Sequence, residues 1–310
     1  MGGKSSGGNS ITCTMTGFSV SYHEYQVLDL QRLFGPEILN LPGTIPHLPL
    51  VFFSALFYQF VYTIIGPWLL HFKPCNPNVP STELSRFHWN INTVSIAQSI
   101  INSALAVYVL LHAEFREGLT AQERILGYHS ETAAALAVST GYFCFHLVKV
   151  WMHKKSEGNF MFAHSVCALC AVCLGFRPLS LHYNAHLMIW ELPNIFLNIQ
   201  RQLDSAGLKS TLTRKVNRLI LLATYTVVRL GTGSLTLWWM ASDMLATLRD
   251  PIPVPTTIIG PDHSTIIVSE AQLPVALAIV QLGALFWLHY QGFYWFAKIV
   301  TKGDLKKEKV

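Results

Sequence analysis

The chain has 310 residues, of which 51% are hydrophobic and only 13% are charged, and its mean hydropathy is +0.36. An ordinary soluble domain carries about 25% charged residues, so the composition excludes a soluble globular protein, a disordered chain and a small disulfide scaffold. The net charge of +5 is mild and spread over short segments, which argues against nucleic-acid binding. The sequence therefore predicts an all-α, polytopic membrane protein.

Seven apolar segments are long enough to cross the hydrocarbon core as helices, which takes about 20 residues each. We expect a helical bundle with spans at 47–72, 89–112, 132–152, 159–176, 179–199, 219–240 and 273–299. The fourth and fifth spans form a hairpin, because the Arg177-Pro178 pair between them breaks a helix. The segments 73–88, 200–218 and 242–272 are expected to be connecting loops.

Three regions are predicted along the chain. Residues 1–46 form a polar N-terminal segment, residues 47–300 form the transmembrane helical domain, and residues 301–310 form a basic tail. The first segment has no apolar stretch followed by a small-residue cleavage site, so no cleaved signal peptide is expected.

Basic residues outside the spans indicate the orientation of the bundle. The first, third and fifth loops and the tail hold thirteen Lys and Arg, whereas the N-terminal segment and the other loops hold six. Cytosolic segments carry the excess of basic residues, so the C-terminus is predicted in the cytosol and the N-terminus in the lumen or outside. The segment Met1–Ser6 fits the N-myristoylation pattern, but the charge count places it on the wrong side, and we expect no myristate.

Ionisable and amide side chains inside apolar spans are costly, and each is a candidate functional residue. Glu191, Asn194 and Asn198 fall on one helix face, beside the helix-interrupting Pro193. Arg229 is expected to pair with Glu191 inside the bundle, and either residue has a purely structural alternative role. The full predicted set comprises the possible catalytic residues His164, Glu191 and Arg229, and a polar cluster of Gln98, His146, Asn194 and Asn198.

Two further patterns suggest metal chemistry only weakly. His182 and His186 have the spacing of one histidine box, but di-iron membrane oxidases use several boxes and paired histidines. Cys167, Cys170 and Cys173 lie along one helix face without the second ligand pair that a zinc site needs. We interpret the histidines as interfacial and the cysteines as packing residues, and we expect no metal site and no bound cofactor.

Five segments in order resemble the TLC-domain family, which includes translocating-chain-associated membrane proteins and ceramide synthases. One of these segments is Glu191-Leu-Pro-Asn-Ile-Phe-Leu-Asn198. The others are Phe87–Asn90, Ser139–Tyr142, Phe160–His164 and Val227–Arg229. The resemblance covers about residues 85–300 and is closest to the lipid-homeostasis branch of the family rather than to the ceramide synthases.

Several positions depart from the ceramide-synthase pattern. The paired histidine of that pattern is reduced to His164, because Ala163 occupies the first position. His146 replaces an acidic residue, and Gln98 replaces a histidine. A further His-Asp and Asp-rich signature is missing. The resemblance therefore leaves open whether the protein is an enzyme.

The resemblance implies a protein of endoplasmic-reticulum type that acts in membrane-lipid homeostasis by binding or handling acyl lipids within the bundle. The alternative is an acyl-CoA-dependent sphingoid-base N-acyltransferase with a reduced site, in which acyl-CoA is a co-substrate. There His164 would act as base or nucleophile, Glu191 would set its tautomer, and Arg229 would hold an oxyanion or carboxylate. A transporter or receptor is a third alternative that rests on the seven spans alone. Membrane lipids are the expected partners, and the oligomeric state is open.

Overall fold

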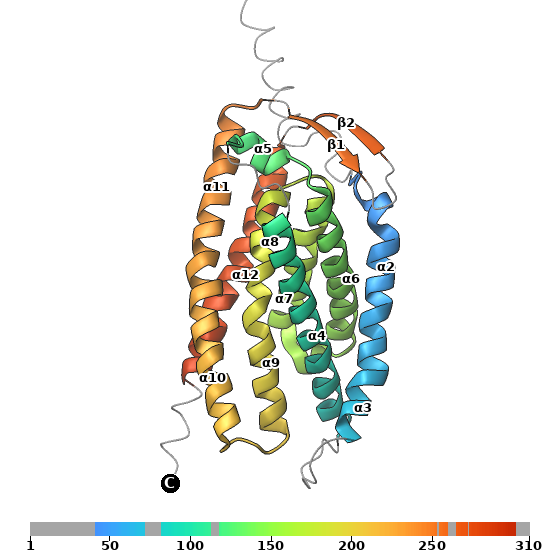
Figure 1. Ribbon diagram of the computed structural model, residues 1–310, viewed down its shortest axis with the longest axis vertical. Coiled ribbons are helices and arrows are strands. Elements are labelled where there is room, and N and C mark those ends of the chain that lie inside the picture. Colours follow the sequence, from blue (N-terminus) through green and yellow to red (C-terminus); the bar gives the residue numbers. More distant parts are fainter. Residues whose placement is uncertain are drawn as a thin grey trace, which may run out of the picture.

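The computed structural model describes residues 41–71, 82–112, 118–252, 254–259, 265–271 and 273–301. The predicted myristoylation pattern, most of the N-terminal segment, much of the first loop and nearly all of the tail lie outside these residues. The described chain forms a bundle of long helices that run along one axis, with a small two-stranded hairpin at one end (Figure 1).

The elements follow the predicted spans in order. The first four passages and the short helix between the second and third comprise α2 Thr44–Phe60, η1 Val61–Ile65, α3 Gly66–His71, α4 Glu83–His112, α5 Ala121–Leu126, α6 Ser130–Met152, α7 Lys154–Cys173 and η2 Leu174–Phe176. The remainder comprises α8 Leu181–Met188, η3 Ile189–Glu191, α9 Leu192–Ser205, α10 Leu212–Thr224, η4 Tyr225–Thr232, α11 Gly233–Arg249, β1 Val254–Ile259, β2 Thr265–Ala271 and α12 Val275–Thr301.

Six of these helical runs are long and apolar enough to cross a bilayer: Thr44–Leu70, Glu83–His112, Ser130–Met152, Lys154–Phe176, Leu212–Arg249 and Val275–Thr301. They correspond to six of the seven predicted spans and confirm the all-α, multi-pass fold class. The fifth predicted span is not one continuous helix, because the 3₁₀ turn η3 separates α8 from α9. Since α8, η3 and α9 all pack against the long helix α4, they still make a passage along the bundle.

Several predicted loops are partly helical in the structure. Arg214 and neighbouring basic residues, expected in a loop, lie in α10, which Thr211 caps by accepting a hydrogen bond from the Arg214 amide at 3.3 Å. The helix α11 continues to Arg249 because Met244 and Thr247 are buried against the bundle. The region expected to be a long loop after Ser242 also contains the antiparallel pair of β1 and β2.

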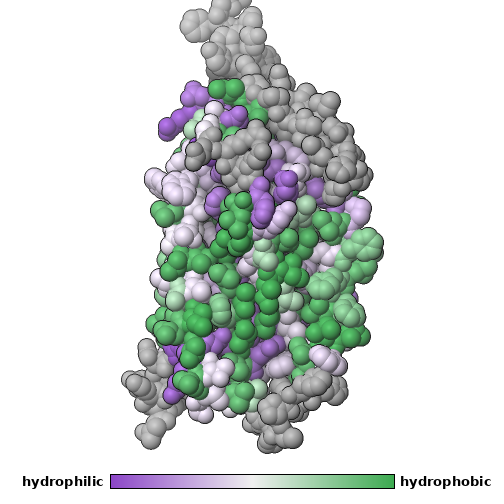
Figure 2. Space-filling model, viewed as in Figure 1, coloured by the Kyte–Doolittle hydropathy of each residue, from purple (hydrophilic) through white to green (hydrophobic). Residues whose placement is uncertain are grey.

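Apolar side chains cover the middle of the bundle. On the face that Figure 2 shows, hydrophobic side chains form a band across the middle, with hydrophilic residues gathered toward the two ends. Large exposed side chains such as Phe53 on α2, Trp238 on α11 and Ile279 on α12 contribute to this lipid-facing surface. The protein is therefore an integral multi-pass membrane protein.

A short helix closes the end of the bundle that carries the hairpin. Thr120 and Glu123 form a capping box at the start of α5: the Glu123 amide donates to the Thr120 hydroxyl at 3.2 Å, and the Thr120 amide donates to the Glu123 carboxylate at 2.7 Å. These hydrogen bonds hold the pKa of the exposed Glu123 carboxyl below its usual value. Arg124 then ties α5 to Asp243 of α11 through two hydrogen bonds, at 2.5 and 2.8 Å.

Candidate functional site

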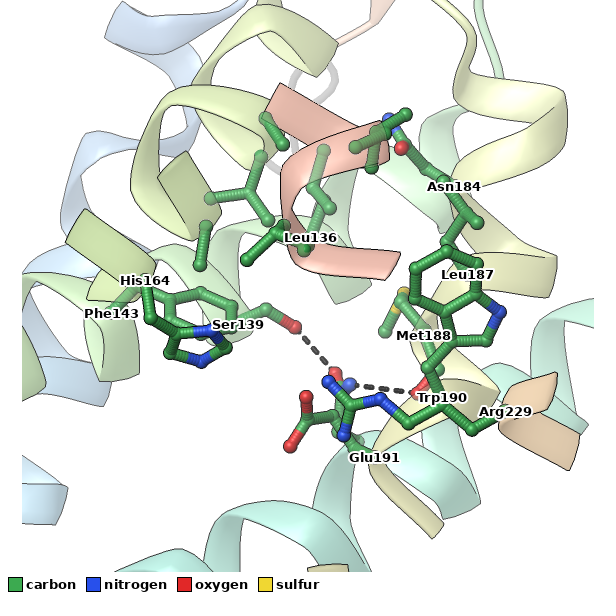
Figure 3. A pocket seen from close by; sticks show the side chains of 16 residues that line it. Leu136, Ser139, Phe143, His164, Asn184, Leu187, Met188, Trp190, Glu191 and Arg229 are labelled. Atoms are coloured by element: carbon green, nitrogen blue, oxygen red, sulfur yellow. Dashed lines mark hydrogen bonds between the residues drawn. The ribbon is translucent and has the colours of Figure 1, made fainter. Parts of the chain in front are cut away.

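A cavity of about 70 Å³ lies in the middle of the bundle, enclosed by residues of α4, α6, α7, α8, η3, η4 and α12. We call it the central cavity. One side of it is apolar, with Leu136, Ala168, Ala171, Val172, Leu285 and Leu288. The other side carries polar groups from different helices, and Figure 3 shows that Ser139, His164, Glu191 and Arg229 point toward the same space.

A second space of about 70 Å³, the polar cavity, adjoins the central cavity and shares Phe143, His164 and Glu191 with it. One part of its wall follows the polar face of α9, through Asn194 and Asn198 to Arg201. Hydrogen bonds connect this face: the Asn198 side-chain amide donates to the Asn194 carbonyl at 2.8 Å, and Arg201 donates to the Asn198 side chain at 3.3 Å. The predicted stripe of Glu191, Asn194 and Asn198 lies along the wall of this cavity.

Gln291 on α12 fixes the orientation of His164. The Gln291 Nε2 donates to the carbonyl of Phe160 at 3.1 Å, which leaves its Oε1 to face His164 Nδ1 at 2.9 Å. An amide oxygen can only accept, so His164 carries its proton on Nδ1 and has a lone pair on Nε2. His164 lines both cavities, and among the described residues its Nε2 has no hydrogen-bond partner. His164 is therefore prepared to accept a proton or hydrogen bond from a guest molecule.

Arg229 brings a buried positive charge to the same cavity. Its side chain is only 3% exposed and lies on the wide π-helical turn η4, a distortion that often marks functional sites. The prediction that Arg229 pairs with Glu191 is wrong in detail, since no direct ion pair joins them in the described part of the chain. Asn194 lies between them: Arg229 donates to Asn194 Oδ1 at 3.3 Å, and Asn194 donates to Glu191 at 2.8 Å. The Arg229 Nε remains unpaired within the described residues.

Hydrogen bonds beside the central cavity connect three helices, α6, α4 and α8. Ser139 of α6 donates to Asn102 Oδ1 of α4 at 2.5 Å, and Asn102 Nδ2 donates to the carbonyl of Met188 at 3.1 Å (Figure 3). Met188 ends α8, where the helix breaks before η3 and leaves carbonyls without intrahelical partners. Asn102 therefore stabilises the break that places Glu191 in the cavity.

Two predicted polar residues have different locations. His146 lines the polar cavity, where its Nδ1 donates to Ser165 Oγ at 3.0 Å, since the Ser165 hydroxyl itself donates to the Met161 carbonyl. Gln98 lies outside both cavities, because it is fully buried and accepts a hydrogen bond from the hydroxyl of Tyr58 on α2. Of the predicted polar cluster, His146, Asn194 and Asn198 therefore line the polar cavity, and Gln98 does not.

His182 and His186 share one face of α8, as their spacing predicts, with ring centroids 5.6 Å apart. They line a separate cavity at the hairpin end of the bundle and do not reach the central cavity. Within the part of the chain that the structure describes, no group of three or more His, Cys, Asp or Glu is arranged to hold a metal ion.

Sequence reasoning missed Gln291 and Ser139 as members of the site, whereas Asn102 was recognised as a polar residue within the second span. Gln291 could have been found in the sequence, because it is an amide side chain within the apolar run of α12. In the structure it is 0% exposed. Asn102 and Ser139 are small polar residues of the kind that join helices in membranes. Their mutual contact depends on the register between α4 and α6, which the sequence does not specify.

The chain is similar to known proteins over most of its length. The family model described as the TLC domain matches residues 88–301. An uncharacterised TLC domain-containing protein of Schizosaccharomyces pombe is 24% identical over 254 residues, covering 82% of this chain and 78% of the relative. Topoisomerase I damage affected protein 4 of Saccharomyces cerevisiae is 24% identical over 227 residues, covering 71% and 78% respectively.

A vertebrate protein is also similar. TLC domain-containing protein 2 of Danio rerio is 27% identical over 191 residues, which cover 59% of this chain and 72% of the relative. No solved structure matches the sequence. The names of these relatives refer to the domain or to a damage phenotype, and none refers to a substrate or ligand.

Proposed function

The chain belongs to the TLC-domain family, and from this premise we propose that it acts in membrane-lipid homeostasis by holding the polar end of an acyl lipid in the central cavity. We propose the endoplasmic reticulum as its location. The predicted orientation, with α9 leading toward the cytosolic side at Arg201, would let the polar cavity communicate with that side.

The observation that carries the proposal is the division of the cavity into an apolar side and a polar side, which meet at His164 and Glu191. A guest with a hydrocarbon part and a hydrogen-bonding end satisfies both sides at once. Arg229 offers donors to a carbonyl or carboxylate oxygen, and His164 Nε2 offers an acceptor to a hydroxyl or amine. At about 30 Å³ per water, the central cavity of about 70 Å³ has room for about two waters. It therefore fits only a small polar end of a lipid, and the remaining chain would extend between helices.

Lipid profiling tests the proposal in cells. Membranes of cells that lack the protein should differ in acyl-lipid composition from membranes with the wild type, and reintroduced His164→Ala protein should fail to restore the wild-type profile. Its expression and location, followed by a fluorescent tag, should remain those of the wild type. An unchanged lipid profile on removal of the protein would contradict the proposal.

The lone pair on His164 Nε2 favours a second function, acyl-CoA-dependent N-acylation of a sphingoid base. In that reaction the amine attacks the thioester carbonyl, His164 takes the amine proton, and the coenzyme A thiolate leaves and is protonated. Arg229 would stabilise the developing oxyanion. The test is N-acylation of sphinganine by the purified protein: turnover that His164→Ala abolishes supports this function, and absence of turnover in the wild type leaves lipid binding.

A further inference from the structure

A third cavity, of about 310 Å³, lies between α5, α8 and α11. We call it the hairpin-side cavity, because it is at the end of the bundle that carries β1 and β2 (Figure 1). None of its lining residues belongs to the central or polar cavity. Neither the proposed function nor the family match accounts for it.

The charged groups of this cavity neutralise one another. Arg124 donates to both carboxylate oxygens of Asp243, at 2.5 and 2.8 Å, and to the carbonyl of Leu119 at 2.5 Å. The Tyr183 hydroxyl donates to the same carboxylate. A headgroup with a net charge would have to disrupt this network or be partly buried without compensation, and both are unfavourable.

The remaining polar groups that α11 brings to this cavity are two hydroxyls, of Thr236 and Ser242, and the indole N–H of Trp239. Thr236 is only 5% exposed, lines the cavity, and makes no hydrogen bond to any residue that the structure describes. Other threonines of this helical run bond to the carbonyl four residues earlier, as Thr232 and Thr247 do at 2.8 Å. The Thr236 hydroxyl is thus free to bond a guest.

Two other residues of α11 shape the rest of this wall. The Ser242 hydroxyl donates to the Trp238 carbonyl at 2.9 Å, which leaves its lone pairs to accept. Trp239 is 55% exposed and lines the cavity from the lipid-facing side. Asp243 and Thr236 are seven residues apart on the helix, which is about 10 Å along its axis. The cavity therefore extends from the end of the bundle toward the apolar band in its middle.

We propose that the hairpin-side cavity binds an uncharged lipid whose headgroup carries hydroxyl groups, as glycerides and sterols do. The neutral Arg124–Asp243–Tyr183 network selects against charged headgroups. The Thr236 and Ser242 hydroxyls bond the alcohol group, and the Trp239 ring packs on the apolar body of the lipid. The site takes its ligand from the leaflet on the hairpin side and is independent of the function proposed for the central cavity.

Photo-crosslinking of the purified full-length protein in phosphatidylcholine vesicles tests this site. Three diazirine probes are compared: a diacylglycerol, a cholesterol analogue and a phosphatidic acid. We expect the diacylglycerol, the sterol or both to label peptides of α8 and α11, and the difference between these two identifies the source of the alcohol. The phosphatidic acid should label these peptides weakly.

Matched variants locate the label. Thr236→Val keeps the side-chain shape and should lower labelling about fivefold, the effect of one hydrogen bond. Thr232→Val, one turn away with its hydroxyl already bonded to a carbonyl, should label as the wild type does. Ser242→Phe, at an exposed position, should fill the cavity and abolish labelling. Equal labelling by phosphatidic acid, labels elsewhere in the chain, or equal labelling of the two threonine variants would overturn the proposal.

Discussion

Gln291 and Gln281 lie on the same helix and differ in what their amides do. Both are fully buried, but Gln291 bonds to His164 and Phe160, whereas the Gln281 amide has no partner among the described residues. Removing a partner from a buried hydrogen bond costs about 1–3 kcal/mol, whereas replacing an unsatisfied amide by an apolar group is nearly neutral. Gln291→Leu should therefore lower the thermal stability of the detergent-solubilised protein and Gln281→Leu should not. Equal melting temperatures for the two variants would show that Gln291 does not hold His164.

The relay from Glu191 through Asn194 to Arg229 makes a second prediction. Glu191→Gln and Arg229→Gln should each destabilise the protein, and the double variant should recover part of the loss, with a coupling energy of about 0.5–3 kcal/mol. Because Asn194 lies between the two residues, the same cycle in an Asn194→Ala background should show less coupling. Thermal unfolding in detergent measures each term. Additivity in the Asn194-containing protein would contradict the relay.

Helix α2 approaches α6 closely at Gly141. A Cβ added to Gly141 of α6 would lie 2.5 Å from the Val51 carbonyl oxygen and 2.6 Å from the Ser54 Cβ, so only glycine allows α2 this near. Gly141→Ala should destabilise the protein by about 1–3 kcal/mol, the cost of overpacking. Gly283→Ala on α12, where nothing lies within 4 Å, should be neutral or slightly stabilising. Thermal melting compares the two, and a harmless Gly141→Ala would refute the close contact.

The sequence predicts helices better than it predicts their ends. Apolar runs of span length located six continuous helices, because length and hydropathy are local properties. The break in the fifth span could be suspected from Pro193, but the placement of η3 depends on Asn102 from another helix. The basic residues of α10 suggested a loop, since the helix there is set by the Thr211 cap rather than by hydropathy. For the site, the α9 stripe followed from helical spacing, whereas the His164–Gln291 contact joins residues 127 positions apart.

The first and last long helices point to opposite ends of the bundle. In Figure 1, α2 begins near the β-hairpin and α12 ends at the opposite end, as an odd number of passages would require. Combined with the basic-residue bias, this predicts a lumenal N-terminus and a cytosolic C-terminus. In intact microsomes, protease should remove a C-terminal epitope tag and spare an N-terminal one. Alkyne-myristate should not label Gly2. Removal of both tags by the protease, or myristoylation of Gly2, would contradict this orientation.

The retention of acyl lipid by the central cavity can be measured by native mass spectrometry of the purified protein. Ala171→Leu places extra volume in the apolar side of the cavity, and Val166→Leu, on the same helix α7 but 42% exposed, serves as the control. We predict that wild type and Val166→Leu retain an acyl lipid and that Ala171→Leu loses it while keeping its fold. Equal lipid retention by all three folded proteins, or none in the wild type, would contradict binding of an acyl lipid in this cavity.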